Sequence, residues 1–298
     1  MRFRTAGLLL TGLAALLATA CGLAGPSGGA SGRIEVVAAE NFWGSIATQL
    51  GGDRVHVTSI IINPDTDPHV YDATPNDARL IARASYVIVN GAGYDPWAAK
   101  LAAANPVSGR LLLDVGDLVG VREGGNPHFW YSPDYVDRVI HRITADLKRL
   151  DSGDSSYFDQ RSSQYQEAGL KDYHDTLASI RQRYAGAPVG ASESIFVYLA
   201  RATGLDLITP PGYLKAISEG TDPSAADKAT VDRQLASRQV RVFVFNSQNS
   251  TPDVQGMVRK AKAAGIPVVE ISETSRPDQT FQDWQTRQLK SLLRSLGG

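Results

Sequence analysis

Strand-like and helix-like segments alternate along almost the whole chain, and this alternation constrains the fold more than any other feature. Short apolar runs typical of buried strands occur at residues 34–39, 55–62, 86–90, 111–114, 188–191, 205–208, 240–245 and 267–271. Most of them are separated by stretches in which apolar residues recur at helical spacing. Strands that alternate with helices favour a mostly parallel sheet with helices on its faces. The sequence therefore predicts an α/β protein.

Two helix starts are marked clearly. Residues 74–77 read Thr-Pro-Asn-Asp, and residues 132–134 read Ser-Pro-Asp. Thr or Ser can cap a helix, Pro suits the first helical position, and Asp suits the positively polarised N-terminal end. After residue 134, apolar residues continue at helical spacing to Leu150, so one face of that helix is expected to be buried.

A long polar stretch of helical character covers residues 154–184 and contains one Gly and no Pro. A helix this long and polar often bridges two lobes rather than lying in one core. We therefore predict two α/β lobes, residues 33–153 and 185–298, each with a mostly parallel sheet, joined by one long linker helix at 154–184.

The N-terminus has the features of an export signal. Arg2 and Arg4 precede an uncharged apolar run at residues 6–17, and small residues lead to Cys21, the single cysteine of the chain. The run is too short for a membrane span, so residues 1–21 are predicted to be a signal peptide. The position of Cys21 resembles a bacterial lipobox, in which the cysteine is lipidated; the alternative is an ordinary secreted protein cut at an A-x-A-like site. Residues 22–32, rich in Gly, Ala and Ser, are predicted to form a flexible tether.

Charge is balanced and dispersed. The chain has 30 basic and 31 acidic residues and a formal net charge of −1. No basic stripe or interleaving of aromatic and basic residues indicates a nucleic-acid partner.

Two of the five histidines occur in the same local motif. Asp67-Pro68-His69 and Asn126-Pro127-His128 each lie in a turn-like segment before a predicted helix. Neutral imidazole is the commonest protein ligand for first-row divalent metals. Ligands of open α/β sheets bind outside the carboxyl ends of the strands, and His69, Glu193 and Glu273 all lie just past predicted strands. The repeated motif therefore indicates two histidine ligands directed at one metal ion.

These segments resemble the metal-binding receptors of bacterial ABC transporters, the TroA- and ZnuA-like solute-binding lipoproteins for manganese, zinc or iron. The resemblance covers essentially the whole chain after the tether. It is carried by residues 67–69, 74–77, 84–91, 126–133 and 192–199. It implies the fold described above and a cell-membrane lipoprotein on the extracytoplasmic face.

The resemblance also implies four metal ligands: His69, His128, Glu193 and Glu273. The family usually has Asp at the last position, in a Thr-Asp-Ser setting, whereas this chain has Ser-Glu-Thr at residues 272–274. Glu270 and Asp278 are nearby alternatives for the fourth ligand.

The expected ligand set contains two imidazoles and two carboxylates. Carboxylate oxygens suit manganese or iron better than an all-imidazole or thiolate site would. Zinc-type members often carry a long loop rich in His and acidic residues near the second histidine, and residues 121–125 are short and lack His. We therefore expect manganese or iron, with zinc as the alternative. Imidazoles must be neutral to bind, so acid should weaken binding between roughly pH 7 and 5, with the carboxylates competing only at lower pH.

These features favour a protein that captures a divalent metal outside the cytoplasmic membrane and delivers it to a permease with its ATPase. We expect it to be a monomer and not an enzyme. One alternative is a secreted metallohydrolase with an open His₂-carboxylate site, although the chain has no H-E-x-x-H and no G-x-S-x-G motif. The other is a receptor for an organic ligand such as a corrinoid or siderophore, against which the paired Pro-His motifs argue.

Overall fold

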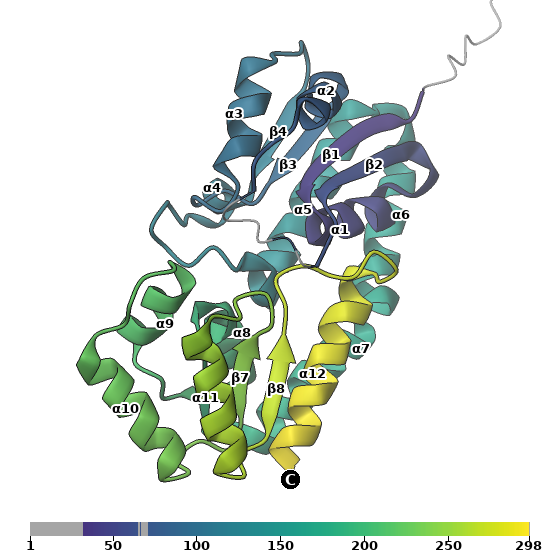
Figure 1. Cartoon of the computed structure of the whole chain (residues 1–298). Coiled ribbons are helices and arrows are strands. Elements are labelled where there is room, and N and C mark those ends of the chain that lie inside the picture. Colours follow the sequence, from purple (N-terminus) through teal and green to yellow (C-terminus); the bar gives the residue numbers. More distant parts are fainter. Residues whose placement is uncertain (1–31, 65, 67–70, 298) are drawn as a thin grey trace, which may run out of the picture. The chain divides into compact units, whose positions relative to one another are not determined.

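The computed structural model describes residues 32–64, 66 and 71–297, and two parallel sheets of four strands each organise it (Figure 1). The first sheet contains β1 (Ile34–Glu40), β2 (Val55–Ile61), β3 (Tyr86–Val89) and β4 (Leu111–Asp114), in the order β2-β1-β3-β4. The second contains β5 (Pro188–Ala191), β6 (Asp206–Leu207), β7 (Phe243–Asn246) and β8 (Val268–Ile271), in the order β6-β5-β7-β8. Every neighbouring pair is parallel. The predicted two-lobe α/β fold is confirmed.

Helices cover both sheets. The first lobe contains α1 (Asn41–Gly51), α2 (Pro75–Arg83), α3 (Pro96–Ala104), α4 (Val115–Val119) and α5 (Pro133–Leu150). The second contains α8 (Val197–Thr203), α9 (Pro211–Ser218), α10 (Ala225–Ala236), α11 (Pro252–Ala263) and α12 (Phe281–Gly297). The sequence did not predict α3, α4 and α9. All three are short, and α3 is Ala-rich without a distinct polar face, so none shows a helical period clearly.

Strand β1 shows why the strands read as continuous apolar runs. Val36 and Ala38 belong to the core that also contains α1, whereas Val37 and Ala39 belong to the cluster with Ile81 of α2. Successive side chains of a strand point to opposite faces of the sheet. Because helices cover both faces, every position on β1 except Glu35 is buried.

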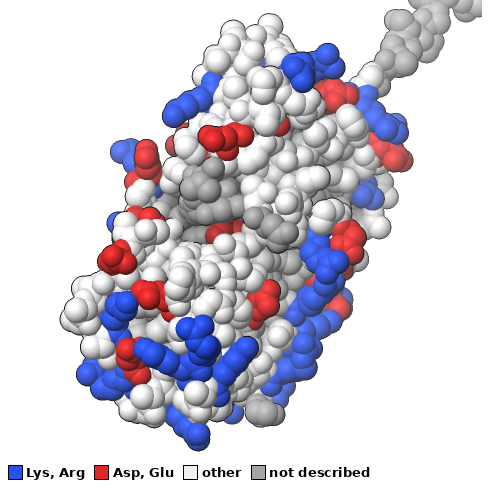
Figure 2. Space-filling view, viewed as in Figure 1, with Lys and Arg blue, Asp and Glu red and all other residues white. Residues whose placement is uncertain are grey.

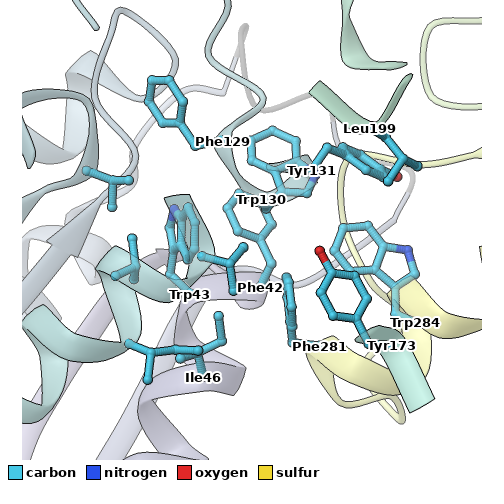
Figure 3. Packing of buried hydrophobic residues seen from close by; sticks show 14 of the residues in the cluster. Phe42, Trp43, Ile46, Phe129, Trp130, Tyr131, Tyr173, Leu199, Phe281 and Trp284 are labelled. Atoms are coloured by element: carbon cyan, nitrogen blue, oxygen red, sulfur yellow. The ribbon is translucent and has the colours of Figure 1, made fainter. Parts of the chain in front are cut away.

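One aromatic core extends across both lobes (Figure 3). Phe42 of α1 stacks on Trp130 with the ring centroids 4.2 Å apart, and on Trp284 of α12 at 6.4 Å. Phe281, also on α12, and Tyr173 lie in the same cluster. The lobes therefore share buried apolar surface, which restrains their relative movement.

The predicted linker helix contains an irregularity. It comprises α6 (Ser155–Gln164), a π-helical turn (Tyr165–Gly169) and α7 (Lys171–Tyr184). The backbone N–H of Leu170 donates to the carbonyl of Tyr165, five residues earlier, at 2.9 Å. A Cβ atom on Gly169 would lie 2.8 Å from the Tyr165 ring, so only glycine fits under that ring without a shift. The segment is helical as predicted, and the π-helical turn ends at its single glycine.

Charged side chains of both signs are dispersed over the face shown in Figure 2, with Lys and Arg densest toward the end of the second lobe that carries α10 and α11. Several of these cations pair with carboxylates: Lys228 lies 2.7 Å from Asp253, and Lys260 lies 2.5 Å from Asp232. None of the helices in the described part of the chain has the length and apolar character that a membrane crossing requires.

Candidate metal centre

Three of the predicted ligands meet in one buried group. Ligand atoms of His128, Glu193 and Glu273 all lie within 4.8 Å of one another. Each of the three residues is at most 4% exposed. His69 and Cys21 lie outside the described residues. The group offers one imidazole and two carboxylates to a single cation.

The imidazole of His128 is held by an amide. His128 directly precedes a 3-10 turn (Phe129–Tyr131), and its Nδ1 lies 2.7 Å from Oδ1 of Asn126. An amide oxygen only accepts hydrogen bonds, so this contact places the ring proton on Nδ1 and the lone pair on Nε2. Metal-binding histidines almost always donate their second ring N–H in this way. The other histidines in the described ranges, at positions 56, 141 and 174, are exposed.

Glu193 stands two residues past β5, at the start of a 3-10 turn (Ser194–Phe196). Asn246 donates its side-chain N–H to Oε1 at 2.7 Å, and Asn249 donates to Oε2 at 2.8 Å. Ser218 lies 3.5 Å from the same Oε2. These neutral donors orient the carboxylate and leave its charge for a cation.

Glu273 stands two residues past β8. Its Oε1 accepts from Asn246 at 2.7 Å, and its Oε2 accepts from the hydroxyl of Tyr94, a residue of the first lobe, also at 2.7 Å. The two alternatives for the fourth ligand are placed differently: Glu270 is exposed on β8, and the exposed Asp278 lies 3.5 Å from Arg276. The structure thus brings Glu273, and neither alternative, to His128 and Glu193.

Burial and mutual repulsion act on the two carboxyl groups. Burial raises the pKa of Glu193, and the nearby Glu273 carboxylate raises it further, although the Asn249 and Asn246 hydrogen bonds oppose the rise. A proton therefore stays on this pair at pH values where an exposed carboxyl would be ionised. The raised pKa of Glu193 departs from the expectation that the carboxylates compete for protons only at low pH, because that expectation assumed exposed carboxyl groups.

A second pair of buried carboxyl groups lies in the first lobe. Glu40 ends β1 and is 0% exposed, and Asp95 is 1% exposed. Asp95 accepts backbone N–H groups from Asn90 and Gly91 at 2.7 and 2.8 Å. Burial, and next the charge of Asp95, raise the pKa of Glu40 well above its ordinary value; burial raises the pKa of Asp95 to about 6.

Sequence reasoning did not identify the residues that support the ligands. Tyr94, Asn246 and Asn249 carry no motif of their own. A positional signal existed for Asn246, because it ends β7 at the same edge of the sheet where Glu193 and Glu273 follow their strands.

A cleft of about 490 Å³ reaches the ring of His128. One wall is formed by first-lobe residues that include Gly93 and Gly124, and the other by second-lobe residues that include Lys215 and Ser218.

The two parallel sheets and the buried donor group together have the architecture of a two-lobe solute-binding protein. Residues 36–295 match the family described as zinc-uptake complex component A, periplasmic, or ZnuA. The chain belongs to this family.

Relatives in this family are named for different metals. The metal ABC transporter substrate-binding lipoprotein FimA of Streptococcus parasanguinis is 26% identical over an alignment of 273 positions that covers 82% of this chain and 81% of that protein. The manganese ABC transporter substrate-binding lipoprotein PsaA of Streptococcus pneumoniae serotype 4 is 24% identical and covers 97% of each chain. The high-affinity zinc uptake system protein ZnuA of Bacillus subtilis is 22% identical and covers 80% of each.

Solved structures show the same fold. A manganese-bound mutant form of a periplasmic metal binding protein from Candidatus Liberibacter asiaticus has a TM-score of 0.74 at 22% identity, and the match covers 88% of this chain and 98% of that one. FpvC of Pseudomonas aeruginosa, solved with a nickel ion, has a TM-score of 0.72 at 21% identity, covering 89% and 97%.

Proposed function

We propose that this protein captures a divalent transition-metal ion between its lobes and delivers it to the permease and ATPase of an ABC transporter. The observation that carries the proposal is the group formed by His128, Glu193 and Glu273, three buried ligands with their donor atoms within 4.8 Å. His69 is proposed as the fourth ligand on the strength of its Pro-His motif. Four protein ligands leave no position that a reacting water needs, so the site suits binding and release.

Manganese or iron is the proposed cargo, with zinc as the competitor. Oxygen ligands favour the harder ions, and Glu273 adds a second carboxylate to Glu193. The Tyr94 and asparagine hydrogen bonds occupy part of the carboxylate lone pairs and restrict how each can turn toward an ion. Relatives named for manganese and for zinc are about equally similar to this chain, so the preference rests on the ligand set.

Native mass spectrometry tests the proposal directly. The mature chain is stripped with a chelator, then offered manganese, iron(II) and zinc singly and in competition. We expect one ion per chain and no dimer peak. A chain that binds none of them, or that hydrolyses ester, amide or phosphate substrates when loaded, would contradict it.

We further propose that Cys21 carries the lipid that holds the protein on the extracytoplasmic face of the membrane. A single acyl chain holds weakly and stable anchoring takes about two signals, which a diacylglyceryl cysteine supplies. Cys21→Ala should therefore release the protein into the medium or block its processing, as cell fractionation would show. A processed Cys21→Ala protein that still sediments with membranes contradicts this.

The comparisons favour neither alternative function. The relatives named above are substrate-binding proteins of transporters or of uptake systems. Their names describe transport or uptake, so the hydrolase alternative gains no support from them.

A further inference from the structure

The side chain of Asn246 is hydrogen-bonded to both carboxylates of the site. It is the last residue of β7, is 0% exposed, and donates from one side-chain nitrogen to two carboxylates. The Nδ2 atom lies 2.7 Å from Oε1 of Glu193 and 2.7 Å from Oε1 of Glu273. An amide nitrogen has two hydrogens, so it can serve both at once.

The orientation of this amide is fixed from its other end. Its Oδ1 accepts the backbone N–H of Gln248 at 3.0 Å. A flipped amide would turn an oxygen toward two carboxylates and a nitrogen toward an N–H donor, so the assignment of Nδ2 to the carboxylates is unambiguous. The backbone N–H of Asn246 donates to Ser192 Oγ at 3.2 Å, which fixes the end of the strand.

The other donors reach one carboxylate each. Asn249 donates to Glu193, and Tyr94 donates to Glu273. Among the described residues, Asn246 is the one whose side chain bonds to both proposed carboxylate ligands.

An uncharged amide that bridges two carboxylates, as Asn246 does, is well suited to a site for a cation. Two carboxylates in one buried site repel each other, and a Lys or Arg between them would remove the repulsion by supplying the charge that the metal should supply. An amide holds both oxygens with hydrogen bonds and adds no net charge. The pair can then stay at a spacing set by the protein before the ion enters.

We propose that Asn246 is a positioning residue that sets the spacing of Glu193 and Glu273 and thereby favours manganese or iron over zinc. This inference rests on the proposed function. Hydrogen-bonding partners of metal ligands typically contribute about 10- to 100-fold to metal affinity. Imidazole suits zinc, whereas carboxylate oxygens suit manganese, so zinc should tolerate a loosened carboxylate pair better than manganese does.

The test compares Asn246→Leu with Asn249→Leu, the same substitution at an asparagine that holds one carboxylate. Isothermal titration with manganese and with zinc is run on both variants and the wild type. We expect Asn246→Leu to weaken manganese binding by about 10- to 100-fold, to weaken zinc binding less, and so to raise the zinc-to-manganese preference. Asn249→Leu should have a smaller effect and leave the preference near that of the wild type.

Asn246→Ser keeps one hydrogen-bond donor in a smaller side chain. It tests the proposal even if Asn246→Leu does not fold. It should give an intermediate loss, and the electron paramagnetic resonance spectrum of bound manganese should broaden relative to the wild type. Wild-type affinities in both Asn246 variants, or equal losses at positions 246 and 249, overturn this inference while leaving the proposed function intact. A wild-type chain that binds no metal overturns the proposed function as well.

Discussion

The sheets of the two lobes have the same strand order, but the buried acid pairs at their carboxyl edges lie in different surroundings. In the strand orders β2-β1-β3-β4 and β6-β5-β7-β8, β1 corresponds to β5 and β3 to β7. Each lobe places an acidic residue at the end of the first of these strands, Glu40 in one and Glu193 in the other, and a second buried carboxyl beside it. The surroundings of the two acid pairs then diverge.

The first-lobe pair is supported by backbone and the second-lobe pair by side chains. Asp95 accepts two backbone N–H groups from its own loop. Glu193 and Glu273 instead share an amide bridge and stand beside His128. Among the described residues, an imidazole joins the second-lobe pair in a group of three possible ligands, and none joins the first-lobe pair. An imidazole and oriented neutral donors distinguish the pair that we assign to metal binding.

The largest effect should come from removing the imidazole. His128→Ala leaves the carboxylates in place but removes a proposed ligand, and metal affinity should fall well over tenfold, a loss above about 1.4 kcal/mol. The matched control is His141→Ala, an exposed imidazole beside Asp137, which should bind like the wild type. Calorimetry on both decides this, and wild-type affinity in His128→Ala would remove His128 from the site.

A direct test of the two acid pairs compares Glu193→Gln with Glu40→Gln. Each substitution replaces a buried carboxyl by an amide of similar shape. Glu193→Gln removes a ligand charge and should weaken manganese binding by roughly tenfold or more. Glu40→Gln should leave the affinity within about twofold, because Glu40 belongs to the pair without an imidazole. Equal losses of manganese affinity in the two variants would contradict the assignment of metal binding to the Glu193–Glu273 pair alone.

The sequence carried enough information to predict the fold and to select three candidate ligands, His128, Glu193 and Glu273, that lie together in the structure. Strand positions followed from apolar runs because both sheets are covered on both faces, as β1 shows. His128 had a repeated motif, and Glu193 and Glu273 followed predicted strands. Short helices such as α3 were not predicted, because a few helical turns without a polar face show no helical spacing of apolar and polar residues.

The supporting residues of the site could not be predicted in the same way. Tyr94 and Glu273 are separated by 179 positions in the chain, yet their side chains are hydrogen-bonded. Such pairs arise from the packing of one lobe on the other, which no local pattern encodes. The raised pKa of Glu193 has the same origin, since burial and the approach of Glu273 both depend on the folded arrangement.

Both acid pairs should make the metal-free protein less stable as pH rises. The pKa of Glu40 is raised on folding from an ordinary value of 4.5, so above that value the folded chain keeps a proton that the unfolded chain has lost. Stability then falls with increasing pH until the folded pKa is passed.

We expect urea unfolding of the metal-free protein to show this decline between roughly pH 5 and 8. Glu40→Gln should flatten it. Manganese should offset the part due to Glu193 and Glu273, because the ion replaces their proton, and its affinity should decline on acidification over the same range. A metal-free protein whose stability rises with pH would contradict the assignment of raised pKa values to these groups.

The smallest effects should come from the two acidic neighbours of Glu273. Glu270 is exposed on β8, and Asp278 is exposed beside Arg276. Surface substitutions away from a site usually change stability by less than about 0.5 kcal/mol. Glu270→Gln and Asp278→Asn should therefore bind manganese and zinc like the wild type, whereas Glu273→Gln should lose affinity for both and more for manganese. The three variants differ by one charge each and lie within nine positions of the chain, so a general electrostatic effect would weaken all three alike. If Glu273→Gln binds metal like the wild type and either Glu270→Gln or Asp278→Asn loses affinity, the fourth ligand is that neighbour and not Glu273.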